Sequence, residues 1–210
     1  MRTGLLLAVL LLASPTASRS DSSVPPPPPF RRSNATVLLA SDFREGGMHG
    51  WRPDQPAYWQ VENGALCATL PERKQVHSLI VAGSPQWTDY ALDLDLCAVR
   101  GVDRGAAVRV DGKRGIGVDL RGPGYDDVLL HRDRVQLGRA ATPNANGRWH
   151  HLRIEARGQR YRVFVNHALV LDRTDRGRAH PRGGIALAAY TGGVGQCRVC
   201  FANVVVTALP

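Results

Sequence analysis

Hydrophobic and polar residues alternate with a period of two, rather than 3.6, from residue 36 to the end of the chain. In residues 90–99, Leu92, Leu94 and Leu96 alternate with Asp93 and Asp95. Successive side chains of a strand point to opposite faces, so this pattern predicts a strand with one buried and one solvated face. Further strands are expected at residues 37–40, 58–70, 106–110, 116–120, 128–130, 135–137, 151–156, 162–166, 169–171, 185–190 and 199–207.

The spacing of these strands defines the fold class. Glycine, aspartate and proline separate the strands, and no stretch shows a convincing amphipathic helical pattern. The 22 glycines and 14 prolines of the 210 residues also favour turns over helices. We therefore predict an all-β, two-sheet antiparallel sandwich in a single domain spanning residues 36–210.

The first 18 residues have the pattern of a secretory signal peptide. Arg2 precedes an apolar run from Leu5 to Ala13, and small residues follow. A run of this length is too short to span a bilayer, which needs about 20 apolar residues. The alternative is an N-terminal core helix. We predict a secreted protein, extracellular or periplasmic, without a stable membrane anchor.

Residues 19–35 are polar and contain five consecutive prolines, Pro25 to Pro29. This composition predicts a disordered linker of extended polyproline character. The alternative is a ligand for a proline-recognition module.

Four cysteines are present, Cys67, Cys97, Cys197 and Cys200. Export permits disulfides, whereas a Cys-x-x-Cys pair also suggests zinc or redox chemistry. Residues three apart in a regular strand face opposite sides, about 10 Å from each other, which is too far for a disulfide. We therefore expect Cys197 and Cys200 to pair with Cys67 and Cys97, in either order.

The number and distribution of charged residues indicate which classes of molecule the chain could bind. The chain has 27 Lys and Arg against 18 Asp and Glu, which gives a net charge of +9. The arginines are scattered along the chain, and no basic motif interleaved with aromatic residues is present, so nucleic acid is not an expected partner. The net field would attract an acidic or cell-surface polysaccharide.

Several local patterns occur in a familiar order. They are Trp-Gln-Val-Glu-Asn-Gly-Ala-Leu at 59–66, Gly-Arg-Trp-His-His-Leu-Arg-Ile at 147–154, Tyr-Arg-Val-Phe-Val-Asn at 161–166 and Phe-Ala-Asn-Val-Val-Val at 201–206. The chain resembles the concanavalin A-like (laminin G-like) jelly-roll superfamily and most resembles the secreted bacterial 3-keto-disaccharide hydrolase-like domains. The resemblance implies a jelly roll whose concave face meets carbohydrate in relatives.

The resemblance also bears on metal binding, because some relatives hold a structural calcium near the first and last strands. Relatives often have Phe-Asp-Asn in the closing strand, whereas this chain has Ala202 at the Asp position. The change removes an oxygen ligand, so no cofactor is expected. Asp42 remains the candidate for a calcium ligand.

The sequence lacks the carboxylate pattern of glycosidases with this fold, Glu-x-Asp-x-x-Glu. The nearest match, Asp93-Leu94-Asp95, lacks both glutamates, and Ala98 occupies the last position. No Gly-x-Ser-x-Gly or His-Glu-x-x-His motif is present. Glycosidase chemistry is therefore not the first expectation.

Odd- and even-numbered residues of a strand lie on opposite faces of the sheet, and this parity predicts a binding surface. If Val108, Val110, Val118 and Leu120 point into the core, the alternating polar residues point outward. They combine hydrogen-bonding groups with one aromatic ring, a composition that suits a sugar, although a solvated sheet face is the alternative. The candidate ligand-binding residues are Arg109, Asp119, Arg121, His131, Gln136 and Tyr190.

Three functions follow from this reading. The first is a secreted carbohydrate-binding or interaction module without glycosidase chemistry. The second is a hydrolase or lyase acting on glycosides, including 3-keto-glycosides, with Asp119 or His131 transferring a proton and Arg109 polarising the keto group. The third is a structural or adhesion domain without a small ligand.

Overall fold

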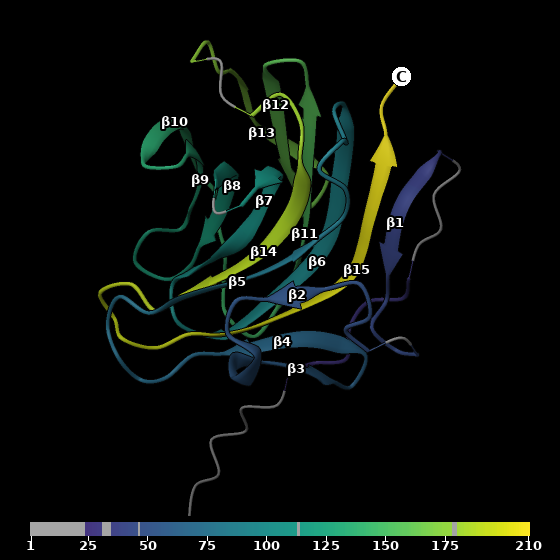
Figure 1. Ribbon diagram of the computed structural model, residues 1–210. Helices are drawn as coiled ribbons and strands as arrows, with labels where there is room; N and C mark the ends of the chain where they lie inside the picture. The colour runs from purple at the N-terminus through teal and green to yellow at the C-terminus, as the bar shows by residue number, and fades with distance from the viewer. Residues whose placement is uncertain (1–23, 31–34, 46, 113, 178–179) are drawn as a thin grey trace, which may run out of the picture.

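The computed structural model describes residues 24–30, 35–45, 47–112, 114–177 and 180–210. Two antiparallel sheets pack face to face, which confirms the predicted all-β sandwich (Figure 1). The only helix among these residues is a single 3₁₀ turn, Pro56–Tyr58, and none of their helices is long and apolar enough to cross a membrane. The predicted signal peptide, residues 1–18, lies outside the described residues.

The larger sheet has eight strands in the described chain. Their order is β13 (Ala168–Thr174), β12 (Arg160–Val165), β11 (Trp149–Arg157), β6 (Tyr90–Arg100), β15 (Arg198–Ala208), β4 (Ala65–Thr69) and β3 (Trp59–Glu62), and β1 (Val37–Ser41) also pairs with β15. The smaller sheet has seven strands in the order β10 (Val135–Ala141), β9 (Asp127–Arg132), β8 (Arg114–Arg121), β7 (Asp103–Asp111), β14 (Gly184–Tyr190), β5 (His77–Ala82) and β2 (Arg52–Pro53).

The core lies between the two sheets and is built by the alternation seen in the sequence. Leu92, Leu94 and Leu96 of β6 are fully buried, as are Val118 and Leu120 of β8. Each such side chain contributes about 1.5–3 kcal/mol by leaving water. The two sheets are therefore held together mainly by their inner faces.

Two strand predictions differ from the structure. Strand β5 was not expected, because its apolar residues are consecutive and do not alternate with polar ones. The predicted strand at 58–70 is a hairpin in which Asn63 and Gly64 both have positive φ, 50° and 76°. These angles are those of a tight two-residue turn, whose twist matches that of the flanking strands.

A β-bulge in β7 reverses the predicted orientation of two residues. Val108 lies opposite Ile185 and Val110 lies opposite the adjacent Gly184, so Arg109 is an extra residue, with φ 54°. The parity argument placed Arg109 outside and Val110 inside, and both placements are wrong. A bulge inserts one residue and shifts the alternation beyond it, so Arg109 is buried, with 1% exposure.

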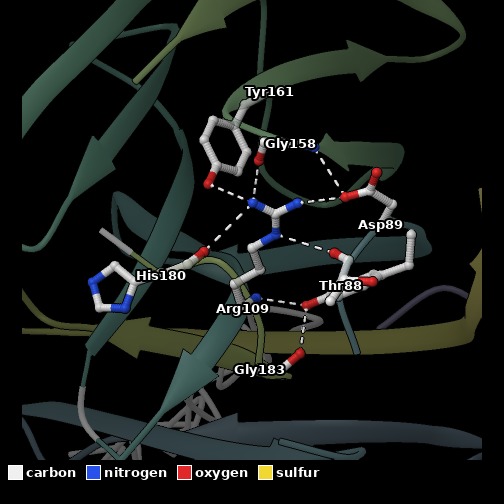
Figure 2. Close-up of polar contacts among 8 residues, drawn as sticks. Thr88, Asp89, Arg109, Gly158, Tyr161, His180 and Gly183 are labelled. Atoms are coloured by element: carbon white, nitrogen blue, oxygen red, sulfur yellow. Dashed lines mark hydrogen bonds and ion pairs between the residues drawn. The ribbon is translucent and has the colours of Figure 1, made fainter. Parts of the chain in front are cut away.

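Buried Arg109 of β7 contacts other segments of the chain at one end of the sandwich (Figure 2). Its Nη2 lies 3.0 Å from Oδ1 of Asp89, and its Nε donates to the carbonyl of Thr88 at 3.1 Å. Its Nη1 donates to the carbonyl of Gly158 and to the hydroxyl of Tyr161. The guanidinium thus ties the start of β6 to the β11–β12 hairpin.

Replacing Arg109 with methionine should lower the free energy of unfolding by about 3 kcal/mol, because the partly buried Asp89 and the neighbouring carbonyls lose the donor that the buried guanidinium supplies. Urea unfolding measures this effect. The control is Arg157→Met at an exposed position of β11, which should change stability by less than about 0.5 kcal/mol. Equal stability of the two variants would contradict the role assigned to Arg109.

One of the two predicted disulfides is present. Cys67 is bonded to Cys200, whereas Cys97 and Cys197 are free and buried. Cys200 of β15 lies opposite Cys67 on one side and opposite Cys97 on the other, and it can bond to only one of them. Cys197 belongs to the core cluster between the sheets. Burial raises the pKa of both free thiols to about 11.

The proline-rich segment is described in part, and that part has no helix or strand. Residues 24–30, expected to belong to a disordered linker, lie against the eight-stranded sheet, where Trp149 Nε1 donates to the carbonyl of Pro25 at 2.9 Å. The neighbouring residues 19–23 and 31–34 of the predicted linker lie outside the described residues.

Candidate functional site

The outer face of the seven-stranded sheet forms a groove of about 1170 Å³. Its lining comes from the positions that alternate with the core residues of β5, β7, β8, β9 and β14, together with the flanking loops. Small residues line the middle of this face, so no large side chain fills the groove there. They are Ala107, Gly115, Gly117, Ala186 and Ala188.

Four of the six predicted ligand-binding residues line this groove: Asp119, Arg121, His131 and Tyr190. Gln136 of β10 lies opposite His131 on the neighbouring strand but is not part of the lining. Arg109 is buried at the end of the sandwich, because the bulge turns it away from this face. The structure therefore removes Arg109 from the groove and from the proposed polarisation of a keto group.

Asp119 and His131 form an ion pair in the groove. Oδ2 of Asp119 lies 3.3 Å from Nε2 of His131, and Nδ1 of His131 donates to the carbonyl of Asp133 at 2.8 Å. Burial lowers the pKa of His131, but the hydrogen bond and charge of Asp119 outweigh it, so the pKa is raised above its ordinary value. The pair can hold a proton close to a bound ligand.

Gly117 makes room for the His131 ring. A Cβ built on Gly117 would lie 2.3 Å from Nε2 of His131. The two residues are cross-strand partners in β8 and β9, so the imidazole can lie over the bare backbone. The absence of a side chain at Gly117 thus places His131 beside Asp119.

Arg121, which lines the groove, is held by an ion pair with Asp127. Its Nε and Nη2 donate to the two carboxylate oxygens of Asp127 at 2.7 and 2.8 Å, and its guanidinium lies 4.5 Å from the ring centroid of Tyr125. Arg139 contacts the same carboxylate of Asp127. Arg121 is therefore held in a fixed position, as a preorganised ligand-binding group requires.

Tyr190 stands between two groove residues that sequence reasoning missed, His77 and Asp103. It is the cross-strand partner of both, and its ring centroid lies 6.0 Å from that of His77. Burial and the negative charge of Asp119 raise the pKa of Asp103, whereas burial lowers the pKa of His77. Asp103 therefore takes up a proton more readily than an ordinary aspartate.

A signal for Asp103 was present in the sequence. Asp103 has the same parity as Ala107 and lies just before the predicted strand at 106–110. Extending that strand by three residues would have placed Asp103 on the groove face. His77 gave no such signal, because its whole strand was missed.

Asp42, the candidate calcium ligand, lies just after β1. Its Oδ1 accepts the backbone N–H of Arg44 at 3.1 Å. Within the described part of the chain, no group of three or more His, Cys, Asp and Glu residues is placed to hold a metal ion. That no cofactor is bound, and that Asp42 is the candidate if calcium is, both stay predictions from the sequence.

Replacing Asp119 with asparagine should lower the pKa of His131, because the carboxylate that favours the imidazolium is lost. Gly117→Ala should lower it as well, because the added methyl group displaces the ring from Asp119. An NMR titration of the imidazole resonances measures the value in each variant. Asp172→Asn, which removes a carboxylate from the other sheet, is the matched control and should leave it unchanged. An unchanged pKa in Asp119→Asn would refute the pairing.

The two sheets and their groove define a concanavalin A-like sandwich. The model of the 3-keto-alpha-glucoside-1,2-lyase-like domain family matches residues 40–207. The chain belongs to this family, as its sequence resemblance predicted. Among curated proteins, no sequence matches this chain.

Three solved structures illustrate the similarity of fold. The carbohydrate binding module CBM66 from Bacillus subtilis is 19% identical with a TM-score of 0.65, over 86% of this chain and 100% of that chain. A putative glycosyl hydrolase from Parabacteroides distasonis is 17% identical with a TM-score of 0.59, over 84% and 100%. The exoplasmic/lumenal domain of VIP36, in a Ca²⁺/Man2-bound form, is 12% identical with a TM-score of 0.61, over 82% and 87%.

Proposed function

We propose that the chain binds a carbohydrate in the groove of the seven-stranded sheet. The observation that carries this proposal is the composition of the groove, whose floor of small residues is bordered by Asp103, Asp119, Arg121 and His131 and by the ring of Tyr190. Small floor residues admit a flat ring close to the backbone. The border offers hydrogen bonds to hydroxyl groups and one aromatic surface.

Two further observations support a sugar as the ligand. The family is described by an activity on a glucoside. Of the structural neighbours, one is called a carbohydrate binding module and another was obtained with bound Man2. The groove is lined by both positively and negatively charged residues. The proposed ligand is therefore not restricted to acidic polysaccharides.

Isothermal titration calorimetry with a panel of mono- and oligosaccharides tests this proposal. Tyr190→Ala and Arg121→Gln should each weaken binding of the sugar that the unmodified chain binds by about 5- to 30-fold, because each removes a contact worth roughly 1–2 kcal/mol. Arg157→Gln on the other sheet removes the same charge as Arg121→Gln and is the control. This variant should bind the sugar as tightly as the unmodified chain. Failure of every sugar to bind would favour the structural or adhesion role.

A second candidate function is cleavage of a 3-keto-glycoside, and the Asp119–His131 pair favours it. In such a substrate the C2–H lies next to the C3 ketone and is acidic. Asp119 or His131 would accept this proton, the C1–O bond would break, and the leaving oxygen would take a proton from a groove acid. Asp103, whose pKa is raised by burial and by Asp119, is the candidate acid. The products are an unsaturated keto sugar and a free hydroxyl compound.

Turnover of a 3-keto-glucoside measured by release of the aglycone tests this candidate. Asp119→Asn and His131→Gln should each lower kcat by about 100- to 10,000-fold, the range for loss of a general acid or base. Arg157→Gln should retain full turnover. If Asp119→Asn and His131→Gln both turn over normally, neither residue transfers the proton.

We also propose that the chain is exported. The cationic start and apolar run of residues 1–18 support export, and so does the Cys67–Cys200 disulfide, since disulfides persist in oxidising compartments. Cell fractionation tests this proposal, and retention in the cytoplasm with an intact N-terminus would contradict it.

A further inference from the structure

The outer face of the eight-stranded sheet, on the opposite side of the molecule from the groove, carries the proline-rich segment 24–30. Val24 packs against a small cluster made by Ala65 and Cys67 of β4 and by Cys200 and Ala202 of β15. The cluster contains the disulfide, whose two cysteines are at most 1% exposed. The segment therefore forms part of the cover over the disulfide.

Exposure along the segment repeats every three residues. Pro26 and Pro29 are exposed, whereas the other residues between 24 and 30 are partly buried. A polyproline II helix has three residues per turn, so one of its three edges faces solvent and the other two contact the sheet. The pattern is that of a polyproline II segment bound along a surface.

The sheet donates hydrogen bonds to this segment one turn apart. Trp149 Nε1 donates to the carbonyl of Pro25 at 2.9 Å, and Asn203 Nδ2 donates to the carbonyl of Pro28 at 2.8 Å. Nη2 of Arg44 also donates to the carbonyl of Pro28, at 3.4 Å. Polyproline II has no internal hydrogen bonds, so its carbonyls are free to accept. An aromatic residue that donates a hydrogen bond to a prolyl carbonyl suits such a segment.

Asn203 is held in an unusual backbone conformation. It has φ 53° and lies in the irregular stretch of β15 where the register with β6 shifts, between Ala202 and Val205. Its Nδ2 also donates to Oδ2 of Asp95 at 2.7 Å, so both amide protons are used. A bulge re-aims a side chain, and here the amide is turned toward the segment and oriented by Asp95.

We propose that this face of the eight-stranded sheet is a binding site for a polyproline II segment, filled by residues 24–30 of the same chain, and that the bound segment shields the Cys67–Cys200 disulfide from reduction. The site recognises carbonyls and prolyl rings rather than particular charged side chains. A proline-rich peptide added in solution therefore fits the same site when the chain's own segment is altered.

Reduction by dithiothreitol under native conditions provides the test. One dithiothreitol thiolate attacks a sulfur of the disulfide, the S–S bond breaks and a mixed disulfide forms. The second dithiothreitol thiol then releases the protein thiol, so that dithiothreitol is oxidised by two electrons and both cysteines take up a proton. Shielding by the segment slows the first attack.

Two variants of the full-length chain weaken the segment's binding in different ways. The first replaces Pro25–Pro29 with Gly-Ser-Gly-Ser-Gly, and the second is Trp149→Phe, which keeps a ring but loses the N–H. Both should accelerate reduction by about tenfold, the effect of losing roughly 1.4 kcal/mol of binding. Trp87→Phe, the same substitution far from the segment, is the control and should not change the rate.

A peptide of the native sequence Val-Pro-Pro-Pro-Pro-Pro-Phe, added to the Gly-Ser variant, should restore slow reduction, whereas a peptide with glycine in place of its prolines should not. Urea unfolding of each variant separates shielding from global stability. Unchanged reduction rates in both variants would overturn the proposal. Faster reduction that matches a loss of global stability, and that the peptide does not reverse, would overturn it as well.

Discussion

The structure depends on one constraint, that neighbouring side chains of a strand cannot face the same side of a sheet. Because the inner faces are filled with leucine, isoleucine and valine, every second residue must lie outside. The outer faces are therefore set by the same sequence positions that set the core. A single inserted residue, Arg109, is enough to exchange the two faces locally. The buried guanidinium then finds carbonyls and Asp89 at the end of the sandwich.

The two outer faces have different chemistry. The seven-stranded sheet has small residues and a polar border, and it leaves a groove. The eight-stranded sheet carries the disulfide, and a segment from the chain's own N-terminal region lies over it. Since the core separates the two faces, a change on one need not alter the other. This separation lets a small domain combine the proposed ligand site with a disulfide on the opposite face.

Periodicity predicted the fold class, the core of β6 and the outward placement of Asp119, Arg121 and Tyr190, because regular strands obey parity. It failed at Arg109, since a bulge depends on which residues the neighbouring strand offers, and one strand's sequence does not contain that information. It also failed for Cys97 and Cys197, because the choice of disulfide partner depends on how β4, β15 and β6 lie side by side.

The central claim is that the ligand occupies the groove face and not the face covered by the proline-rich segment. Alanine methyl groups report on both faces with the same probe, so methyl NMR during titration with mono- and disaccharides is the most direct measurement. Shifts at Ala107, Ala186 and Ala188, with none at Ala65 and Ala202, are the result expected from this account. Shifts confined to Ala65 and Ala202 would contradict it.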